Sequence, residues 1–116
     1  MPVAAILSIS DEGIGYQWYS AKGKQRHVGA VRWSEVKSVE VFKRDLLTFD
    51  LICVQLRTEE EEPLEFDEED SSWEDLMAAL PKHLPGCKAW GAWFSEVAFP
   101  AFEAKPQRVF ERKDDA

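Results

Sequence analysis

Residues 31–86 read VRWSEVKSVEVFKRDLLTFDLICVQLRTEEEEPLEFDEEDSSWEDLMAALPKHLPG, and this stretch decides the fold. Val39 and Val41 alternate with polar residues, and the segment Leu51 to Leu56 is apolar on both faces, which is typical of a strand covered on both sides. The glutamates at 59–62 and Pro63 predict an exposed hairpin turn. Because a parallel crossover needs about a dozen residues, these short connections predict antiparallel pairing.

The segment that follows this hairpin has the pattern of an amphipathic helix. Its large apolar residues follow the i, i+3, i+4, i+7 rule, and they are Trp73, Leu76, Met77 and Leu80. Ser72 stands where a capping residue is expected, and two acidic residues follow it at the positive end of the helix. Pro81 predicts that the helix ends or kinks near Leu80.

The flanking segments extend this pattern in both directions. Residues 4–9, 14–18 and 26–33 alternate and are joined by short polar turns, so they predict an antiparallel meander. A shorter helical pattern runs from Ala89 to Val97, and Val109 and Phe110 predict a last short edge strand.

These elements predict an α+β fold: an antiparallel meander sheet of about six strands, packed against one amphipathic helix and a second short helix. We expect one domain over residues 1–112 and a frayed tail over residues 113–116. The expected core comprises Ile6, Tyr16, Trp18, Val31, Trp33, Val39, Val41, Ile52, Val54, Leu56, Trp73, Leu76, Leu80, Trp93 and Phe94.

Charge and composition narrow the classes of function. The chain has 116 residues and a formal net charge of -8, which disfavours nucleic acid and anionic membrane surfaces as partners. The apolar run near the start is too short for a signal peptide, so we expect a cytoplasmic location. Cys53 and Cys87 lack metal-ligand spacing; two reduced thiols or one long-range disulfide are the two interpretations. No cofactor is implied.

Acidic residues concentrate between Glu59 and Asp75, which contain eleven of the 22 carboxylates and no basic residue. This segment is either a docking surface for a basic partner or a solvated turn followed by an acidic helix start. Calcium is disfavoured because residues 67–70 lack the alternating oxygen ligands and the glycine of an EF-hand. The candidate contact residues are Glu60, Glu61, Glu62, Glu68, Glu69 and Asp70.

The sequence offers three other candidate sites. A basic turn with Lys22, Lys24 and Arg26 is either a solubilising tip or a phosphate site. The C-terminal aromatic residues are either core or a recognition surface, for which the candidates are Trp90, Phe99 and Phe102. His27 and His83 lie in no recognised catalytic motif, so a catalytic or ligand site would be assembled from distant residues such as His27, Asp45, Asp50 and Cys53.

Several motifs along the chain carry a resemblance. They are TrpSerGluVal at 33–36, LysArgAsp at 43–45, AspLeuIleCys at 50–53, LeuProGly at 84–86 and PheProAlaPhe at 99–102. Together they resemble a group of small, uncharacterised bacterial proteins, to which no biochemical role is attached. The order of a meander and a late helix also loosely resembles the pleckstrin-homology-like superfold, which implies a docking scaffold.

The leading functional hypothesis is a non-enzymatic protein-interaction module that contacts an unidentified, basic partner through its acidic surface. An immunity-like inhibitor of a basic toxin is the sharper form of this hypothesis. A small-ligand-binding or catalytic protein is the alternative. Homodimerisation through an exposed strand or the aromatic C-terminal segment is a further prediction.

Overall fold

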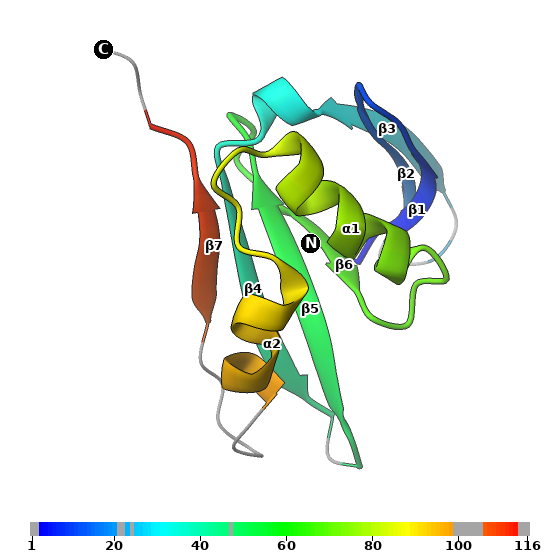
Figure 1. Ribbon diagram of the computed structural model, residues 1–116. Coiled ribbons are helices and arrows are strands. Elements are labelled where there is room, and N and C mark those ends of the chain that lie inside the picture. Colours follow the sequence, from blue (N-terminus) through cyan, green and yellow to red (C-terminus); the bar gives the residue numbers. More distant parts are fainter. Residues whose placement is uncertain (1–2, 21–22, 24, 47, 99–105, 114–116) are drawn as a thin grey trace.

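The computed structural model describes residues 3–20, 23, 25–46, 48–98 and 106–113, and its fold is α+β as predicted (Figure 1). The strands are β1 (Ala5–Ile9), β2 (Gly13–Tyr19), β3 (Arg26–Arg32), β4 (Ser38–Asp45), β5 (Asp50–Arg57), β6 (Leu64–Asp67) and β7 (Gln107–Glu111). The helices are α1 (Trp73–His83) and α2 (Trp90–Ala98), and η1 (Trp33–Glu35) is a short 3-10 turn.

The strands form two antiparallel sheets, so the prediction of one six-stranded meander is wrong. The first sheet has the order β1-β2-β3 and the second has the order β6-β5-β4-β7. The physical reason is that η1 turns the chain between β3 and β4, and β7 takes the edge of β4 that a meander would give to β3. The Ala4 N–H, just before β1, donates a backbone hydrogen bond to the Glu65 carbonyl oxygen of β6 at 2.8 Å and so joins the two sheets.

Both helices lie on the same side of the four-stranded sheet, and α1 lies toward the three-stranded sheet (Figure 1). Trp73 is 6% exposed and Leu76 is completely buried, which confirms the predicted apolar face. The helix continues to His83, so the predicted end near Leu80 is wrong, and the alternative of a kink there stays a prediction. Pro81 is tolerated because it lies in the last turn, where one missing N–H removes a single helical bond. Ser72 precedes the helix without a side-chain capping bond.

The buried residues of both sheets and both helices form one hydrophobic cluster. Eleven of the fifteen predicted core residues are buried, and Ile6, Tyr16, Trp18 and Phe94 are partly buried against that cluster. Buried residues that the prediction missed include Phe66, Leu84, Val97 and Phe110. The domain boundaries at 1 and 112 stay a prediction. Among the described residues, no helix has the length and apolar character needed to cross a membrane.

Candidate acidic docking site

An open hollow of about 610 Å³ lies beside β3, where the three-stranded sheet faces the turn between β5 and β6. Four carboxylates line it, one from η1 and three from the turn, and they are Glu35, Glu60, Glu61 and Glu62. The rest of the described lining is Tyr16, Ala30, Val31, Thr58 and Leu64, so it includes no lysine or arginine. A hollow with this lining favours a cationic group.

Local hydrogen bonds hold the two acidic segments in place. A Glu35 carboxylate oxygen accepts a hydrogen bond from the Arg32 N–H at 2.9 Å, which fixes η1 against the end of β3. The Glu60 N–H donates to the Thr58 hydroxyl at 3.1 Å, which shapes the turn. Lys37 pairs with Glu59 of this turn at 3.5 Å, outside the lining of the hollow, but both side chains are exposed, so the pair contributes little.

Tyr16 is the polar ring at the inner side of the hollow. Its ring lies against the backbone of β3 at Gly29: a Cβ atom there would be 2.7 Å from the tyrosine Cζ and Oη atoms. Burial raises the pKa of the Tyr16 phenol, and the charges of Glu60 and Glu35 raise it further. The phenol therefore stays protonated and neutral at physiological pH.

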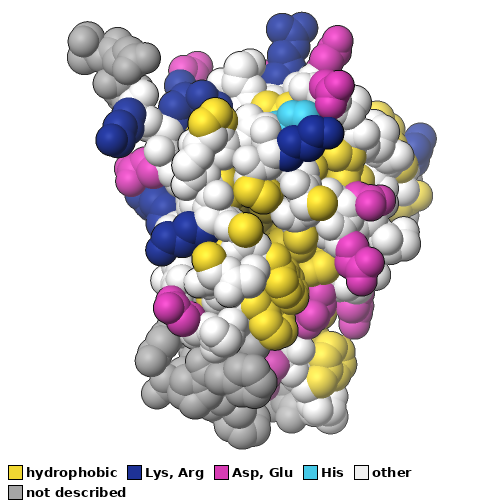
Figure 2. Space-filling model, in the orientation of Figure 1, with side chains coloured by type: hydrophobic (Ala, Val, Ile, Leu, Met, Phe, Trp, Pro, Cys, Tyr) yellow, Lys and Arg dark blue, Asp and Glu magenta, His cyan; other side chains and the backbone are white. Residues whose placement is uncertain are grey.

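A second hollow, of about 570 Å³, lies between the start of α1 and the start of α2. It combines apolar residues with carboxylates, and its lining is Glu68, Asp70, Ser71, Trp73, Glu74, Met77 and Trp90. Figure 2 shows hydrophobic side chains gathered between the two helices, with acidic side chains along one border. The rings of Trp73 and Trp90 meet edge to face at 6.2 Å and 83°. The Trp73 Nε1 atom is buried and has no hydrogen-bond partner in the described part of the chain.

The structure divides the predicted acidic surface between these two hollows. Glu60, Glu61 and Glu62 line the first, whereas Glu68 and Asp70 line the second and Glu69 lines neither. Two of the six also have structural roles: Glu68 accepts a hydrogen bond from the Ile52 N–H, and Asp70 accepts one from the Ile6 N–H. Asp70 also accepts the Ser72 N–H, so it ties β1 to the start of α1.

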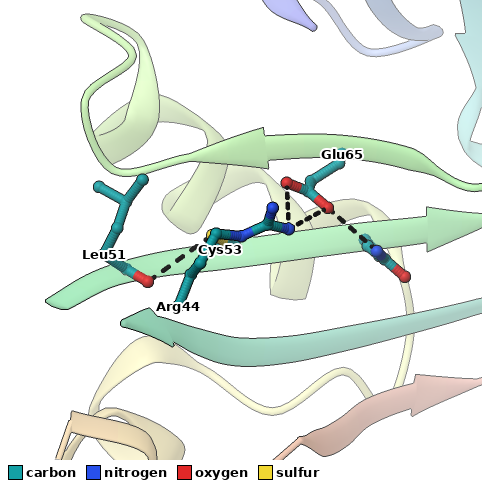
Figure 3. A network of polar contacts seen from close by, with 5 residues as sticks. Arg44, Leu51, Cys53 and Glu65 are labelled. Carbon is teal, nitrogen blue, oxygen red and sulfur yellow. Dashed lines mark hydrogen bonds and ion pairs between the residues drawn. The ribbon is translucent and has the colours of Figure 1, made fainter. Parts of the chain in front are cut away.

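One carboxylate of the acidic segment is buried rather than solvated. Glu65 is 4% exposed, accepts two hydrogen bonds from one Arg44 guanidinium nitrogen at 3.0 and 2.9 Å, and accepts a third from the Gln55 amide at 3.0 Å. Figure 3 shows the Arg44 side chain lying across β5 above Cys53 to reach Glu65. The side chains of the sheet therefore cover their own outer face.

The residues of the alternative catalytic site are not gathered around one point. His27 stacks on Trp18 in the three-stranded sheet, at 4.0 Å between ring centroids. Asp45 and Asp50 are cross-strand partners at the end of the β4–β5 hairpin, where Asp50 also pairs with the buried Lys43 at 3.6 Å. Burial raises the pKa of Cys53 to about 11, so this thiol is a poor nucleophile at neutral pH.

The other residues that the sequence singled out are the two cysteines, His83, the basic turn and the C-terminal aromatic residues. Cys53 and Cys87 are both free, buried thiols, which settles the choice between thiols and a disulfide. His83 stacks on Trp33 at 4.9 Å. In the described part of the chain, no three His, Cys, Asp or Glu residues are placed to hold a metal ion. Arg26 bonds to Gln17 within the sheet. Lys22, Lys24, Phe99, Phe102 and the tail beyond Lys113 lie outside the described residues.

Sequence reasoning missed Tyr16 and Glu35 as parts of the first hollow. Neither residue stands near the acidic segment in the sequence, and only the approach of β3 to the β5–β6 turn brings them together. No protein-family model, curated protein or solved structure matches the chain. The resemblance to a group of small bacterial proteins therefore stays a prediction, and the site is interpreted from its chemistry alone.

Proposed function

We propose that this protein is a non-enzymatic interaction module that binds a basic partner protein at the hollow beside β3. The observation that carries the proposal is the group of Glu35, Glu60, Glu61 and Glu62 around an open hollow whose described lining has no positive charge. Clefts lined by one sign of charge concentrate field lines and attract groups of the opposite sign. The net charge of -8 adds a long-range attraction for a basic protein.

A masking role fits this chemistry. An immunity-like inhibitor of a basic toxin is the sharper form of the proposal, since such a protein presents carboxylates to a cationic surface. The pleckstrin-homology-like architecture stays a proposal for the fold; the two antiparallel sheets and the late amphipathic helix support it.

The test compares two variants with the same change in charge. Glu60→Gln/Glu61→Gln/Glu62→Gln neutralises the first hollow, and Glu69→Gln/Glu74→Gln/Asp75→Asn neutralises three exposed carboxylates outside it. Fluorescence anisotropy with a labelled oligolysine measures affinity at two ionic strengths. We expect the first variant to lose about tenfold in affinity at low salt, and the control to lose about twofold. Equal losses in both variants would contradict a localised site.

A second candidate function is supported by the hollow between the helices. Two perpendicular indoles with carboxylates at the border suit a small organic ammonium ion, which indole faces attract. A Trp90→Ala variant should abolish the heat of tetramethylammonium binding in calorimetry. No heat with the unmodified protein would rule out this candidate and leave the first proposal intact.

A further inference from the structure

The free edge of β3 is the feature from which a binding mode follows. Among the described strands, β3 is an outer strand of the three-stranded sheet and pairs only with β2. The Ser20 N–H donates to the Gln25 carbonyl oxygen, and the Trp33 N–H donates to the Glu12 carbonyl oxygen, at the two ends of this pairing. In an antiparallel ladder the bonded pairs alternate with unbonded pairs, so His27, Gly29 and Val31 bond to β2.

The same alternation directs the backbone groups of Arg26, Val28, Ala30 and Arg32 away from β2. The Arg32 N–H confirms this direction, because it is the group that bonds to the Glu35 carboxylate. No hydrogen bond within the described part of the chain uses the backbone N–H groups of Arg26, Val28 and Ala30. The side chain of Val28 is 61% exposed. An outer strand with unpaired N–H and C=O groups is a template for another strand.

This unpaired edge borders the acidic hollow. Ala30 and Val31 of β3 line the hollow together with Glu35 and the glutamates of the β5–β6 turn. A strand added to β3 would direct alternate side chains to the two faces of the sheet. Those on the inner face would point toward Tyr16 and the carboxylates, while those on the outer face would lie beside Val28 and between Arg26 and Arg32.

We infer that the basic partner binds by strand addition: an extended segment pairs with β3 and directs every second side chain, a lysine or arginine, into the acidic hollow. This inference rests on the proposed function. It adds how the partner binds and which sequence pattern the bound segment of the partner has. The backbone hydrogen bonds would supply affinity, and the alternation would supply specificity. Small or apolar residues suit the outward positions, because they lie beside Val28 and avoid a further positive charge between the two arginines.

A second copy of the chain fits this edge poorly. Antiparallel pairing of two β3 strands about Gly29 would place Arg26 of each copy opposite Arg32 of the other. Like charges at opposite positions destabilise a strand pair, and two chains of charge -8 repel each other. The occupant that the charges favour is therefore a separate, basic segment.

The experiment uses two labelled peptides of identical composition, one with alternating lysine and threonine and one with all lysines in a block. Fluorescence anisotropy measures their affinity for the full chain and for a Val28→Pro variant. Because the Val28 N–H points away from β2, proline at this position removes no bond within the sheet but blocks an added strand. The Glu60→Gln/Glu61→Gln/Glu62→Gln variant reports the electrostatic part separately.

We expect the alternating peptide to bind about tenfold tighter than the block peptide, and Val28→Pro to remove that advantage while the affinity for the block peptide is unchanged. Equal affinities that only the glutamate substitutions lower would overturn strand addition and leave the proposed function standing. Failure of both peptides to bind would contradict the proposed function itself. A dimer in light scattering that Val28→Pro dissociates would show that the occupant is a second copy.

Amide hydrogen exchange on the unmodified protein gives an answer even if Val28→Pro fails to fold. Exchange at Val28 and Ala30 should slow when the alternating peptide is added. The amides of Gly29 and Val31, which already bond to β2, serve as internal controls and should change little. Unchanged exchange at Val28 and Ala30 with peptide bound would overturn the inference.

Discussion

The two sheets of this protein differ in how much of their surface the fold covers. In the four-stranded sheet, neighbouring residues of β5 that point to opposite faces, Cys53 and Val54, are both completely buried. In the three-stranded sheet, Val28 and Leu7 are 61% and 48% exposed. The difference teaches that the four-stranded sheet contributes stability on both faces, whereas the three-stranded sheet keeps one face and one edge available for contact.

The cover of the four-stranded sheet has two different sources. The helices and the hydrophobic cluster cover its inner face, and the ion pair of Arg44 with Glu65 covers part of its outer face. Within the part of the chain that the structure describes, the three-stranded sheet has only the inner cover. A change in the four-stranded sheet should therefore lower the stability of the whole domain, whereas a change on the open face of the three-stranded sheet should alter binding alone.

The largest expected effect comes from truncating a central side chain. Phe66 of β6 is completely buried and meets the ring of Tyr16 edge to face at 6.4 Å. Phe66→Ala should lower the free energy of unfolding by about 3 to 5 kcal/mol, because it leaves a cavity in the shared core. Urea denaturation measures this free energy. Val28→Ala is the matched control, and we expect it to change the free energy of unfolding by less than about 0.5 kcal/mol. Similar losses in both variants would remove the distinction between the sheets.

The outer cover can be tested through its ion pair. Arg44→Met should lower the free energy of unfolding by about 2 kcal/mol, because it leaves the Glu65 carboxylate buried without its cation. The loss stays below that for a fully buried ion pair because the Arg44 side chain is half-exposed. Adding Glu65→Gln to Arg44→Met should recover at least half of the loss in urea denaturation. A loss from Arg44→Met below about 0.5 kcal/mol would show that Glu65 stays solvated without its partner.

The sequence predicted that β5 is covered on both faces, but not which residues cover its outer face. The helical spacing of α1 identified Leu76 as core, and the apolar residues on both faces of β5 predicted a strand covered on both sides, which the burial of Cys53 and Val54 confirms. Nothing local distinguishes Glu65 from its acidic neighbours, since its burial depends on Arg44 from another strand. The division into two sheets was also out of reach, because β7 pairs with β4 across more than half of the chain.

The candidate site was predictable only as a charge concentration. Glu60, Glu61 and Glu62 were identified from composition, and they do line one hollow. Composition could not show that Glu68 and Asp70 line the other hollow, because this depends on β6, which separates the two ends of the acidic segment. The free edge of β3 could not be inferred from the sequence, since the expected meander would have paired it with β4.

The buried thiols of Cys53 and Cys87 give a pH-dependent test of their burial in the folded protein. Burial raises the pKa of Cys53 and of Cys87 from 9.0 to about 11. Above pH 9 the unfolded chain therefore loses these protons before the folded chain does, so the free energy of unfolding should fall between pH 9 and 11. Urea denaturation across this range measures the slope, and Cys53→Ala/Cys87→Ala should flatten it, with Tyr16 retaining a smaller contribution of the same sign. An unchanged slope in the double variant would assign the effect to other groups.

The smallest effect that separates the two sides of the three-stranded sheet comes from a single methyl group. Gly29→Ala places a Cβ atom 2.7 Å from the Tyr16 ring on the covered inner side of the sheet. It should therefore lower the free energy of unfolding, measured by urea denaturation, by about 1 to 2 kcal/mol. Gly91→Ala in α2 is the matched control: its Cβ meets no described atom within 4 Å, and it should stabilise by up to about 1 kcal/mol. Because the cost of Gly29→Ala arises from the clash with Tyr16, combining it with Tyr16→Ala should give less than the sum of the two single losses. A purely additive result would mean that the ring does not lie against β3, and the inner side of the acidic hollow would then be open at Gly29.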